Sequence, residues 1–409
     1  MNSKLKTAIF SICLMAISIL TQAQDQALIY GKVTTIDGDS YEGQLRWGKE
    51  EAFWTDLFNG NKEENENYRY LTREDRNQLK DKQRRGTRWG NSWVSWNSNN
   101  SWETTHEFQA RFGDIKMLEI DRRSEVRLTM RNGETFYVQD GSNDFGAEIH
   151  VMDAELGKSS FRWSRIESVE FMNTPTQLMD KMGEPLYGTV EFYGGEYTGF
   201  IQWDHDERLS TDILDGDTRD GDMKIEFGKL ASIERERGGS NVVTASGREL
   251  YLRGSNDVNS ENRGIIVTTD FGRVDIPWRE FKRVTFQDAP SNYKKYADFA
   301  DLKEISGTVV TTNGEELKGK IIYDLDEEYT FEMLQGEDDN VKYIIPFESV
   351  RVITPKNYDF SNIELKNGET ITIGDARDVN EQNAGVLVFV GSGDPEYILW
   401  ENIKEIKLD

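Results

Sequence analysis

The sequence predicts an all-β protein made of six tandem barrel units of about 50 residues each, arranged as three pairs. Three observations lead to this fold class. An alternating strand, a tight glycine turn and a second alternating strand recur at the start of each pair. A related hairpin pattern opens the second unit of each pair. All six units close on an aromatic residue that is followed by apolar residues spaced near three.

The opening hairpins begin at Ile29, Leu186 and Ile305. Their turns are Asp37-Gly38, Gly194-Gly195 and Asn313-Gly314. Such dipeptides supply the positive φ angles that two-residue hairpin turns require. A glycine also recurs in each second strand, as Gly43, Gly199 and Gly319. A glycine inside a strand predicts a bulge or a sharp bend there.

The closing signature is longest at Val274–Phe286, which reads V-D-I-P-W-R-E-F-K-R-V-T-F. Related copies stand at Phe161–Phe171, Ile398–Leu408, Ile344–Ile353 and Phe227–Ile233. The spacing predicts a strand, one 3₁₀ turn and a second strand. Its aromatic residue recurs in every unit, so we expect it in the core: Trp163, Phe227, Trp278, Phe347 and Trp400. A hairpin with this late turn is typical of an SH3-like or Sm-like barrel, and a six-bladed β-propeller is the competing architecture.

In two of the three pairs, the second unit contains a Gly that is followed by an Asp ten residues later and by an Asn fifteen residues later. These residues are Gly247, Asp257 and Asn262, and again Gly368, Asp378 and Asn383. Together with L-K-N-G before Gly368 and N-A-G-V from Asn383, this resembles the first motif of Sm-like proteins. The resemblance implies a small barrel fold and no more, because the Arg-Gly of the second Sm motif is absent. Locally, these Asp and Asn residues are typical of turns that hold a loop.

The repeats divide the chain into five segments after its first residues. The expected pairs span 24–174, 184–287 and 304–409, with linkers at 175–183 and 288–303. Pro175 and Pro290 open the two linkers, and spaced apolar residues follow each of them. We therefore expect both linkers to form short helices.

The first 23 residues resemble a secretory signal peptide. Lys4 and Lys6 precede the apolar run Ala8–Leu20, and Thr21-Gln22-Ala23 offers small residues for cleavage near Ala23. This predicts a periplasmic or secreted protein. Cys13 is the only cysteine, so the mature chain would hold neither disulfides nor thiolate chemistry. No other stretch approaches the length of an apolar transmembrane helix, so we do not expect an integral membrane protein.

The charge balance is strongly acidic, with 74 Asp and Glu against 49 Lys and Arg and a net charge of −25. Such a field repels nucleic-acid phosphates, so we expect no nucleic-acid partner. The abundance of acids also means that no pair of carboxylates can be singled out as catalytic.

No sequence motif indicates an enzyme. The segment W-D-H-D-E at Trp203–Glu207 resembles a metal cluster at first sight, yet it recurs as Y-D-L-D-E at Tyr323–Glu327. Because Leu325 replaces His205, we interpret this segment as an acidic strand end and expect no metal. We likewise expect no cofactor and nominate no catalytic residue. The alternative function is a polysaccharide hydrolase that uses carboxylates in a cleft.

One segment, residues 71–107, has no counterpart in the other units. Its first part predicts a helix that starts after Thr72 and stops at Gly86. This helix is rich in basic residues and has almost no apolar face, so we expect it to be exposed. Its second part places Trp89, Trp93, Trp96 and Trp102 among Ser, Asn and Gly.

This insertion is the candidate binding site. Tryptophan faces beside Ser and Asn donors suit stacking on sugar rings or contact with an extended partner. The proposed binding residues are Trp89, Trp93, Trp96, Trp102, Arg84, Arg85 and Arg88. The sequence therefore favours a non-enzymatic exported scaffold that contacts a glycan or protein of the cell envelope. Two other roles for the tryptophans stay open, as a cap on their own barrel or as part of a loop without fixed structure.

Overall fold

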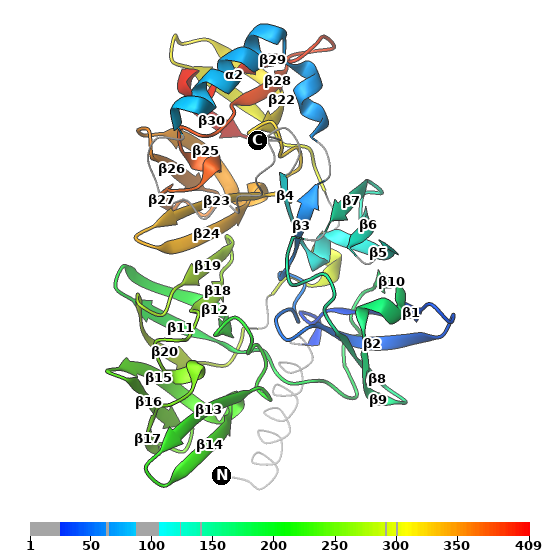
Figure 1. Cartoon of the computed structure of the whole chain (residues 1–409), viewed down its shortest axis with the longest axis vertical. Helices are drawn as coiled ribbons and strands as arrows, with labels where there is room; N and C mark the ends of the chain where they lie inside the picture. The colour runs from blue at the N-terminus through cyan, green and yellow to red at the C-terminus, as the bar shows by residue number, and fades with distance from the viewer. Residues whose placement is uncertain are drawn as a thin grey trace, which may run out of the picture. The chain divides into compact units, whose positions relative to one another are not determined.

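The computed structural model describes residues 25–62, 65–86, 106–122, 124–139, 141–290, 293–299 and 302–409. Within these residues the protein is all-β apart from one α-helix and several single 3₁₀ turns (Figure 1). The strands form large antiparallel sheets of ten and eighteen strands and one two-stranded ribbon, β13–β14. The predicted all-β class is therefore confirmed.

Thirty strands fall into three successive sets of ten. The first set is β1 Tyr30–Thr35, β2 Ser40–Trp47, β3 Leu57–Lys62, β4 His106–Arg111, β5 Ile115–Arg122, β6 Glu125–Met130, β7 Thr135–Gln139, β8 Ile149–Asp153, β9 Gly157–Phe161 and β10 Ile166–Phe171. The second set is β11 Tyr187–Phe192, β12 Gly195–Trp203, β13 Ile213–Thr218, β14 Gly221–Glu226, β15 Leu230–Glu236, β16 Gly239–Thr244, β17 Glu249–Leu252, β18 Ile265–Thr268, β19 Arg273–Ile276 and β20 Phe281–Phe286. The third set is β21 Ser306–Thr311, β22 Glu316–Tyr323, β23 Met333–Asp338, β24 Val341–Pro346, β25 Val350–Pro355, β26 Phe360–Leu365, β27 Thr370–Gly374, β28 Val386–Phe389, β29 Glu396–Ile398 and β30 Ile403–Leu408.

The first set follows the strand order β4-β3-β7-β6-β5-β10-β1-β2-β8-β9. The third set repeats the corresponding pairings, among them β21–β22, β21–β30, β22–β28, β25–β26 and β23–β27. In both sets the opening hairpin pairs with late strands: in the first, β2 pairs with β8, and β1 pairs with β10. Strands that the sequence assigned to one 50-residue unit thus pair with strands of the next.

The strands join into large antiparallel sheets and not into closed barrels, so the six barrel units that the sequence predicts are not confirmed. The physical reason is that residue alternation reports which face of a strand is buried, and it does not report which strand lies alongside. Consecutive strands are neighbours in most proteins, and that tendency suggested independent units.

The predicted strand, 3₁₀ turn, strand signature is confirmed in most of the repeats. The turns are η2 Phe112–Asp114, η3 Trp163–Arg165, η4 Phe227–Lys229, η7 Phe347–Ser349 and η9 Trp400–Asn402. At Trp278 the chain makes a hydrogen-bonded turn instead, in which the Glu280 amide donates to the Pro277 carbonyl at 2.9 Å. Each turn carries an aromatic ring that is buried in the core.

The recurring aromatics are core residues, as predicted, and their exposed fractions are 7% or less. In each set one of these rings packs nearly edge to face against a second aromatic, the residue that ends the second strand of the set. The ring centroids are 5.7 Å apart for Trp163 and Trp47, 5.9 Å for Trp278 and Trp203, and 6.0 Å for Trp400 and Tyr323. The second aromatic also donates a hydrogen bond to the carbonyl of Asp144, Asp257 or Asp378 at 2.9, 2.9 and 2.6 Å. This satisfies its polar atom inside the core.

The glycines of the second strands serve a different purpose from the one predicted. The register between β1 and β2 runs without a shift through Gly43, so no bulge occurs there. A Cβ on Gly43 would lie 2.0 Å from the Met152 carbonyl oxygen, and one on Gly319 would lie 2.0 Å from the Phe389 carbonyl oxygen. Glycine is required at these positions because a third strand approaches too closely for any side chain.

The predicted helical linkers are largely wrong. Residues 173–183, all of which the structure describes, contain no helix. Contacts with distant residues hold the segment instead: Met182 packs beside Phe53 and Leu209, and its amide donates to the Gln44 side chain at 2.8 Å. The described part of the second linker forms one 3₁₀ turn, η6 Tyr296–Phe299, whose Tyr296 ring lies 4.4 Å from Trp54.

The chain contains two compact units. Unit 1 comprises residues 1–58, 111–267 and 277–301, and unit 2 comprises 59–110, 268–276 and 302–409. Unit 1 therefore holds most of the first and second strand sets, and unit 2 holds the third set together with the insertion. In the part of the chain that the structure describes, no helix is long and apolar enough to cross a bilayer.

Candidate functional site

The predicted binding residues lie mostly beyond the described part of the chain. Trp89, Trp93, Trp96, Trp102 and Arg88 fall in residues 87–105, which lie outside it. Arg84 and Arg85 lie in the last turn of the helix α2, which spans Arg73–Gly86, and only their backbone is described. The structure does show what holds the two ends of this segment.

The helix α2 begins where the sequence predicts. The Asp75 amide donates to the Thr72 hydroxyl at 3.2 Å, and the Thr72 amide donates back to the Asp75 carboxylate at 2.9 Å. Reciprocal bonds of this kind satisfy amides that the first helical turn leaves open. The predicted helix is therefore confirmed at its start and at Gly86.

Most of the described helix residues are exposed, as the sequence predicts, but one leucine anchors the helix in unit 2. Leu79 is only 2% exposed and Leu71 only 5%. Both pack in one apolar cluster of unit 2 with the following residues: Ile322, Leu325, Ala384 and Leu387. Figure 1 draws α2 beside β22, β28 and β29, which carry or adjoin these residues. One leucine among charged residues gives almost no periodic signal, so the sequence could not show this contact.

Polar contacts fasten the segment that leads into α2. Asn65 donates its side-chain amide to the Leu325 carbonyl at 2.7 Å. Lys62 reaches Asp326 at 3.1 Å and Glu332 at 2.5 Å. Burial lowers the pKa of Lys62, but Asp326 and Glu332 outweigh this effect and hold its pKa above the usual value. The lysine is therefore a fixed cation within a buried acidic site.

The other end of the insertion is held in unit 2 as well. Phe108 of β4 is 1% exposed, and its ring lies 6.5 Å from that of Phe331. Glu107 accepts a hydrogen bond from the Gln335 side chain at 2.8 Å. Described residues on both sides of the Trp-rich segment are thus packed in the same unit.

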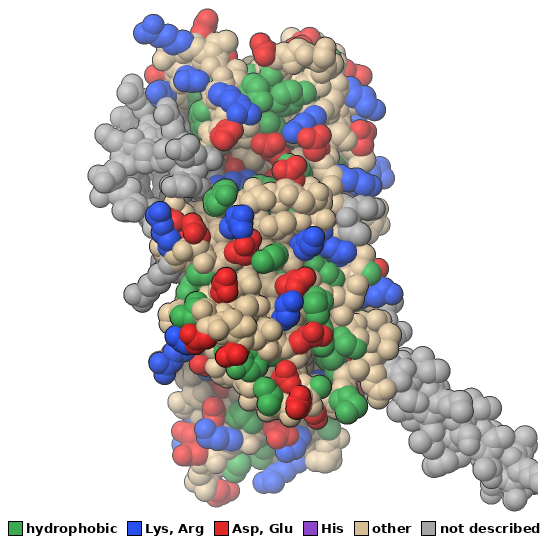
Figure 2. Space-filling model, turned by 90° about the vertical axis from the view of Figure 1, so that its right-hand side faces the viewer, with side chains coloured by type: hydrophobic (Ala, Val, Ile, Leu, Met, Phe, Trp, Pro, Cys, Tyr) green, Lys and Arg blue, Asp and Glu red, His purple; other side chains and the backbone are tan. Residues whose placement is uncertain are grey.

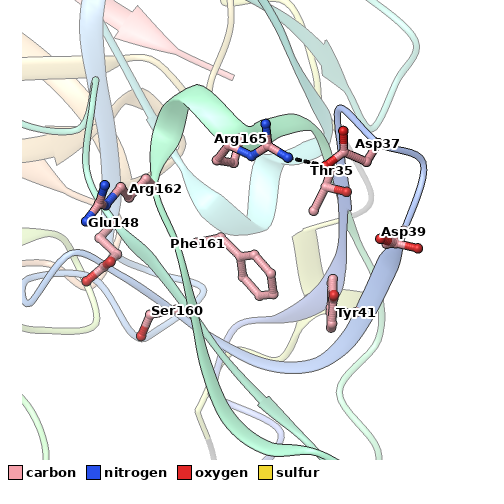
Figure 3. Close-up of a pocket in the computed structure, with 9 residues that line it drawn as sticks. All are labelled: Thr35, Asp37, Asp39, Tyr41, Glu148, Ser160, Phe161, Arg162 and Arg165. Atoms are coloured by element: carbon pink, nitrogen blue, oxygen red, sulfur yellow. Dashed lines mark hydrogen bonds and ion pairs between the residues drawn. The ribbon is translucent and has the colours of Figure 1, made fainter.

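A second candidate site lies in unit 1, at the hairpin between β1 and β2. We call it the hairpin hollow, a cavity of about 450 Å³. It is lined by Thr35, Asp37, Asp39, Tyr41, Glu148, Ser160, Phe161, Arg162 and Arg165. Figure 3 shows Tyr41 and Asp39 on one side of the Phe161 ring, and Glu148, Ser160 and Arg162 on the other. The sequence analysis missed this site because its residues come from three separate stretches of chain.

Two aromatic rings form the apolar part of the hairpin hollow. The ring centroids of Tyr41 and Phe161 lie 4.5 Å apart with their planes tilted by 43°. Thr35 stands beside them at the end of β1 and is 7% exposed. Its hydroxyl oxygen is buried and has no hydrogen-bond partner among the described residues. A buried hydroxyl without a partner is costly to the fold, and its burial also keeps it out of reach of anything that lies in the hollow.

The rim of the hairpin hollow carries charges of both signs. Arg165 forms an ion pair with Asp37, marked by the dashed line in Figure 3. Asp39, Glu148 and Arg162 also line the hollow and make no ion pair with any residue that the structure describes. Three carboxylates and two guanidinium groups leave the hollow slightly acidic, and its net charge favours a neutral or weakly cationic occupant.

Clustered acids, some buried and some half-buried, form a third feature, which we call the acid corners. Asp204, Asp206, Glu207 and Asp257 form one in unit 1, and Asp324, Asp326, Glu327 and Asp378 form the other in unit 2. Burial, then the nearby acids, raises the pKa of Glu207 to about 8 and that of Glu327 well above its usual range. Burial also raises the pKa of Asp257 to about 6.

In each acid corner one aspartate accepts a hydrogen bond from a distant backbone amide. The Asp215 amide donates to Asp257 at 2.6 Å, and the Gln335 amide donates to Asp378 at 2.7 Å. These bonds clamp β13 and β23 to the loops that carry the two aspartates. The predicted turn role falls to the asparagines: Asn262 accepts from the Gly264 amide at 2.9 Å, and Asn383 accepts from the Gly385 amide at 2.8 Å. Across the described ranges, no group of three or more His, Cys, Asp or Glu side chains is arranged to hold a metal ion.

Figure 2 shows acidic and basic side chains interspersed over one face of the molecule.

Comparisons with known proteins do not assign a family. No family model matches the chain, and no curated protein matches it. A solved structure named "Streptogramin B lyase structure" covers 73% of this chain and 94% of its own, at 10% identity and a TM-score of 0.12. A likeness at this level carries no argument about fold or activity.

Proposed function

We propose that this protein is a non-enzymatic, exported β-repeat scaffold of the cell envelope, which binds a glycan or protein partner through its Trp-rich insertion. The observation that carries the proposal is the anchoring of that insertion. Leu71 and Leu79 on one side and Phe108 on the other are all buried in unit 2. A binding segment that is held at both ends loses less conformational entropy on binding than one held at a single end.

The repeated strand order supports the scaffold part of the proposal. We further propose that each set contains two SH3-like groups of five strands. One group runs β10-β1-β2-β8-β9, with η3 before β10, and the other runs β5-β6-β7-β3-β4, with η2 before β5. In this interpretation the second group is inserted between two strands of the first, which would explain why sequential units exchange strands. Repeated units of this kind serve as supports for one variable segment.

Replacing the four tryptophans tests the function directly. We expect the variant Trp89→Ala, Trp93→Ala, Trp96→Ala, Trp102→Ala to lose binding to isolated envelope glycan or peptidoglycan by at least roughly tenfold, because stacked rings dominate such contacts. The measurement is co-sedimentation of the mature protein with the insoluble envelope fraction, followed by capture of protein partners from the soluble fraction.

A control variant with Tyr137→Ala and Tyr358→Ala removes two exposed rings outside the insertion and should bind nearly as the native chain does. Circular dichroism and the unfolding temperature of both variants should stay unchanged. If the tryptophan variant unfolds, its rings belong to a core and the proposal is wrong. Deleting all of 73–102 is a poorer test, because it would also remove the buried Leu79.

A further inference from the structure

Inside unit 2, two strands from different sets pair along their edges. β19 of the second set lies antiparallel to β24 of the third set, with Arg273 opposite Ile344 and Asp275 opposite Lys342. The other edge of β24 pairs with β23, so β24 is the outer strand of a two-stranded ribbon. The strand that precedes the closing turn of one set thus accepts the ribbon of the next set.

In the first set the counterpart of β19 is β9, because β9 precedes Trp163 as β19 precedes Trp278. Lys158 therefore stands in the place of Arg273, since each lies five positions before its tryptophan. Among the described strands β9 pairs only with β8, and it ends the ten-stranded sheet. The outer edge of β9 is therefore open.

In the second set the counterpart of β24 is β14, because β14 precedes Phe227 as β24 precedes Phe347. The two strands also pair with β13 and β23 in the same register. Lys224 therefore stands in the place of Ile344, since each lies three positions before its phenylalanine. In the described part of the chain β14 pairs only with β13, so its outer edge is open as well.

The backbone groups that β9 turns outward follow from its neighbours. The Gly48 amide donates to the Glu148 carbonyl at 2.9 Å, which continues the register between β2 and β8. Because bonded and non-bonded pairs alternate along antiparallel strands, His150 also bonds to β2 and not to β9. Ser160 lies opposite His150, so Ser160, and Lys158 two positions before it, direct their amides and carbonyls away from β8.

The outward groups of β14 follow in the same way. The Phe227 amide donates to the Asp212 carbonyl at 2.9 Å, which continues the register between β13 and β14. By the same alternation Met223 bonds to β13, whereas Lys224 and Asp222 direct their amides and carbonyls outward. These are the counterparts of the positions at which β24 meets β19.

We propose that the open edge of β9 binds the open edge of β14 of a second copy of this chain, in the register of β19 and β24. Lys158 then lies opposite Lys224, and Ser160 lies opposite Asp222, so the outward amides and carbonyls of the two edges meet. The contact uses a different strand on each copy, so every copy keeps a further edge for the next one. It uses no residue of the Trp-rich insertion and is independent of the proposed function.

The charges on the two edges are complementary. The exposed residues on the outer face of β14 and just before it are mainly acidic: Asp220, Asp222, Lys224 and Glu226. The matching exposed residues at β9 are basic, namely Lys158 and Arg162. In the proposed register Arg162 lies opposite Asp220. Lys158 faces Lys224, which Asp215 already neutralises at 3.3 Å, and it has an acid at both diagonal positions.

The first test measures the molecular mass of the chain from Gln24 by sedimentation velocity at increasing protein concentration. We expect reversible self-association between roughly 5 and 500 µM, because a single strand pair is a small interface. The association should weaken with added salt, since charges of opposite sign meet at the contact. A chain that stays monomeric over this range would overturn the proposal.

Cysteine pairs test the strands and their register, because the chain from Gln24 contains no cysteine. Ser159 lies opposite Met223 in the proposed register, in a non-hydrogen-bonded pair, where side chains are closest. A mixture of the Ser159→Cys and Met223→Cys variants should therefore form a disulfide between copies on mild oxidation. A mixture of Ser159→Cys and Ile225→Cys, two positions out of register, should cross-link at least about fivefold more slowly.

Each cysteine variant alone is also informative. Cross-linking of Ser159→Cys with itself, faster than with Met223→Cys, would show that two β9 edges pair and would overturn the choice of β14. Equal cross-linking to Met223→Cys and Ile225→Cys would mean that the proposed register is wrong.

Proline variants test the backbone contact. Ser160→Pro removes an amide that β8 does not use, and Lys224→Pro removes the matching amide of β14. Each should weaken self-association by more than about tenfold without changing the circular dichroism spectrum, because proline is tolerated at an edge position whose amide points outward.

Ser160→Ala is the matched control, because it removes the same hydroxyl and keeps the amide. It should associate as the native chain does. If one proline variant fails to fold, the other, on a different strand, still reports on the contact. Native self-association in a folded proline variant would place the interface elsewhere and overturn the proposal.

Discussion

The first and second strand sets share their strand pattern and their core aromatics, yet they differ at both ends of the opening hairpin. At the turn, the first set has Thr35 beside an open hollow, and the second has Phe192 packed under a Gly-Gly turn. At the far end, Gly48 follows Trp47, while Asp204 begins an acid corner after Trp203. The two sets thus share one strand pattern but present different surfaces, and the difference comes from a few residues at the ends of the hairpin.

The sets are also held together by reciprocal ion pairs inside unit 1. Arg46 of the first set binds Asp212 at 2.6 Å, and Arg208 of the second set binds Asp56. Each aspartate accepts two backbone amides as well, so the charges are buried with their hydrogen-bond partners. This shared frame allows the hairpins to diverge without loss of the fold.

Truncating the ring of the second hairpin has the largest expected effect. Phe192→Ala should lower the free energy of unfolding by about 3–5 kcal/mol, because it opens a cavity under the Gly194 turn. Thr35→Ala, at the equivalent position, should change it by less than about 1 kcal/mol, because its hydroxyl has no hydrogen bond to lose among the described residues. Urea unfolding, monitored by fluorescence, measures the free energy of unfolding of both variants. Equal losses would show that the hollow is as tightly packed as its counterpart.

The acid corner of the second set should make stability depend on pH. The pKa of Glu207 is raised to about 8 from the usual 4.5, chiefly by burial, so the folded state binds a proton that the unfolded state releases. This contribution is fully present below about pH 4.5 and is lost as the pH rises to 8, by roughly 2–4 kcal/mol.

Glu207→Gln should therefore flatten the decline in unfolding temperature between pH 5 and pH 8. The exposed Glu191→Gln is the control and should keep the native slope. If the unfolding temperature of the Glu207 variant declined with pH as steeply as that of the native chain, this carboxyl would be charged in the folded state and another group would titrate.

Filling the hollow has a smaller expected effect on stability than the changes at Phe192 and Glu207. Thr35→Phe should raise the free energy of unfolding by about 0.5–2 kcal/mol, because the new ring buries apolar surface beside Tyr41 and Phe161. Thermal unfolding of the native chain and the variant measures the difference. A clear loss of stability would show that the hollow cannot take a ring as the second hairpin does.

Much of the local structure could be predicted from the sequence. Gly38 and Gly314 mark turns with positive φ, and Trp163 and Trp400 mark the late 3₁₀ turns, because glycine freedom and aromatic spacing act over a few residues. The start of α2 at Thr72 was also predictable from its capping residues.

The candidate sites depended on contacts between distant residues. Leu79 lies in a helix with little apolar character, and only Ile322 and Leu387 far along the chain make it an anchor. The hairpin hollow combines Thr35 with Phe161, which β8 and β9 bring back to the first hairpin. No local pattern carries that information.

The sequence by itself determined that this chain forms strands, where they turn and which aromatic rings are buried, since alternation and turn chemistry are properties of neighbouring residues. Only the tertiary structure decided which strands pair, because hydrogen bonds between β2 and β8 or β1 and β10 join residues about a hundred or more positions apart. It also decided that Asp37 pairs with Arg165, which leaves the Thr35 hydroxyl without a partner among the described residues.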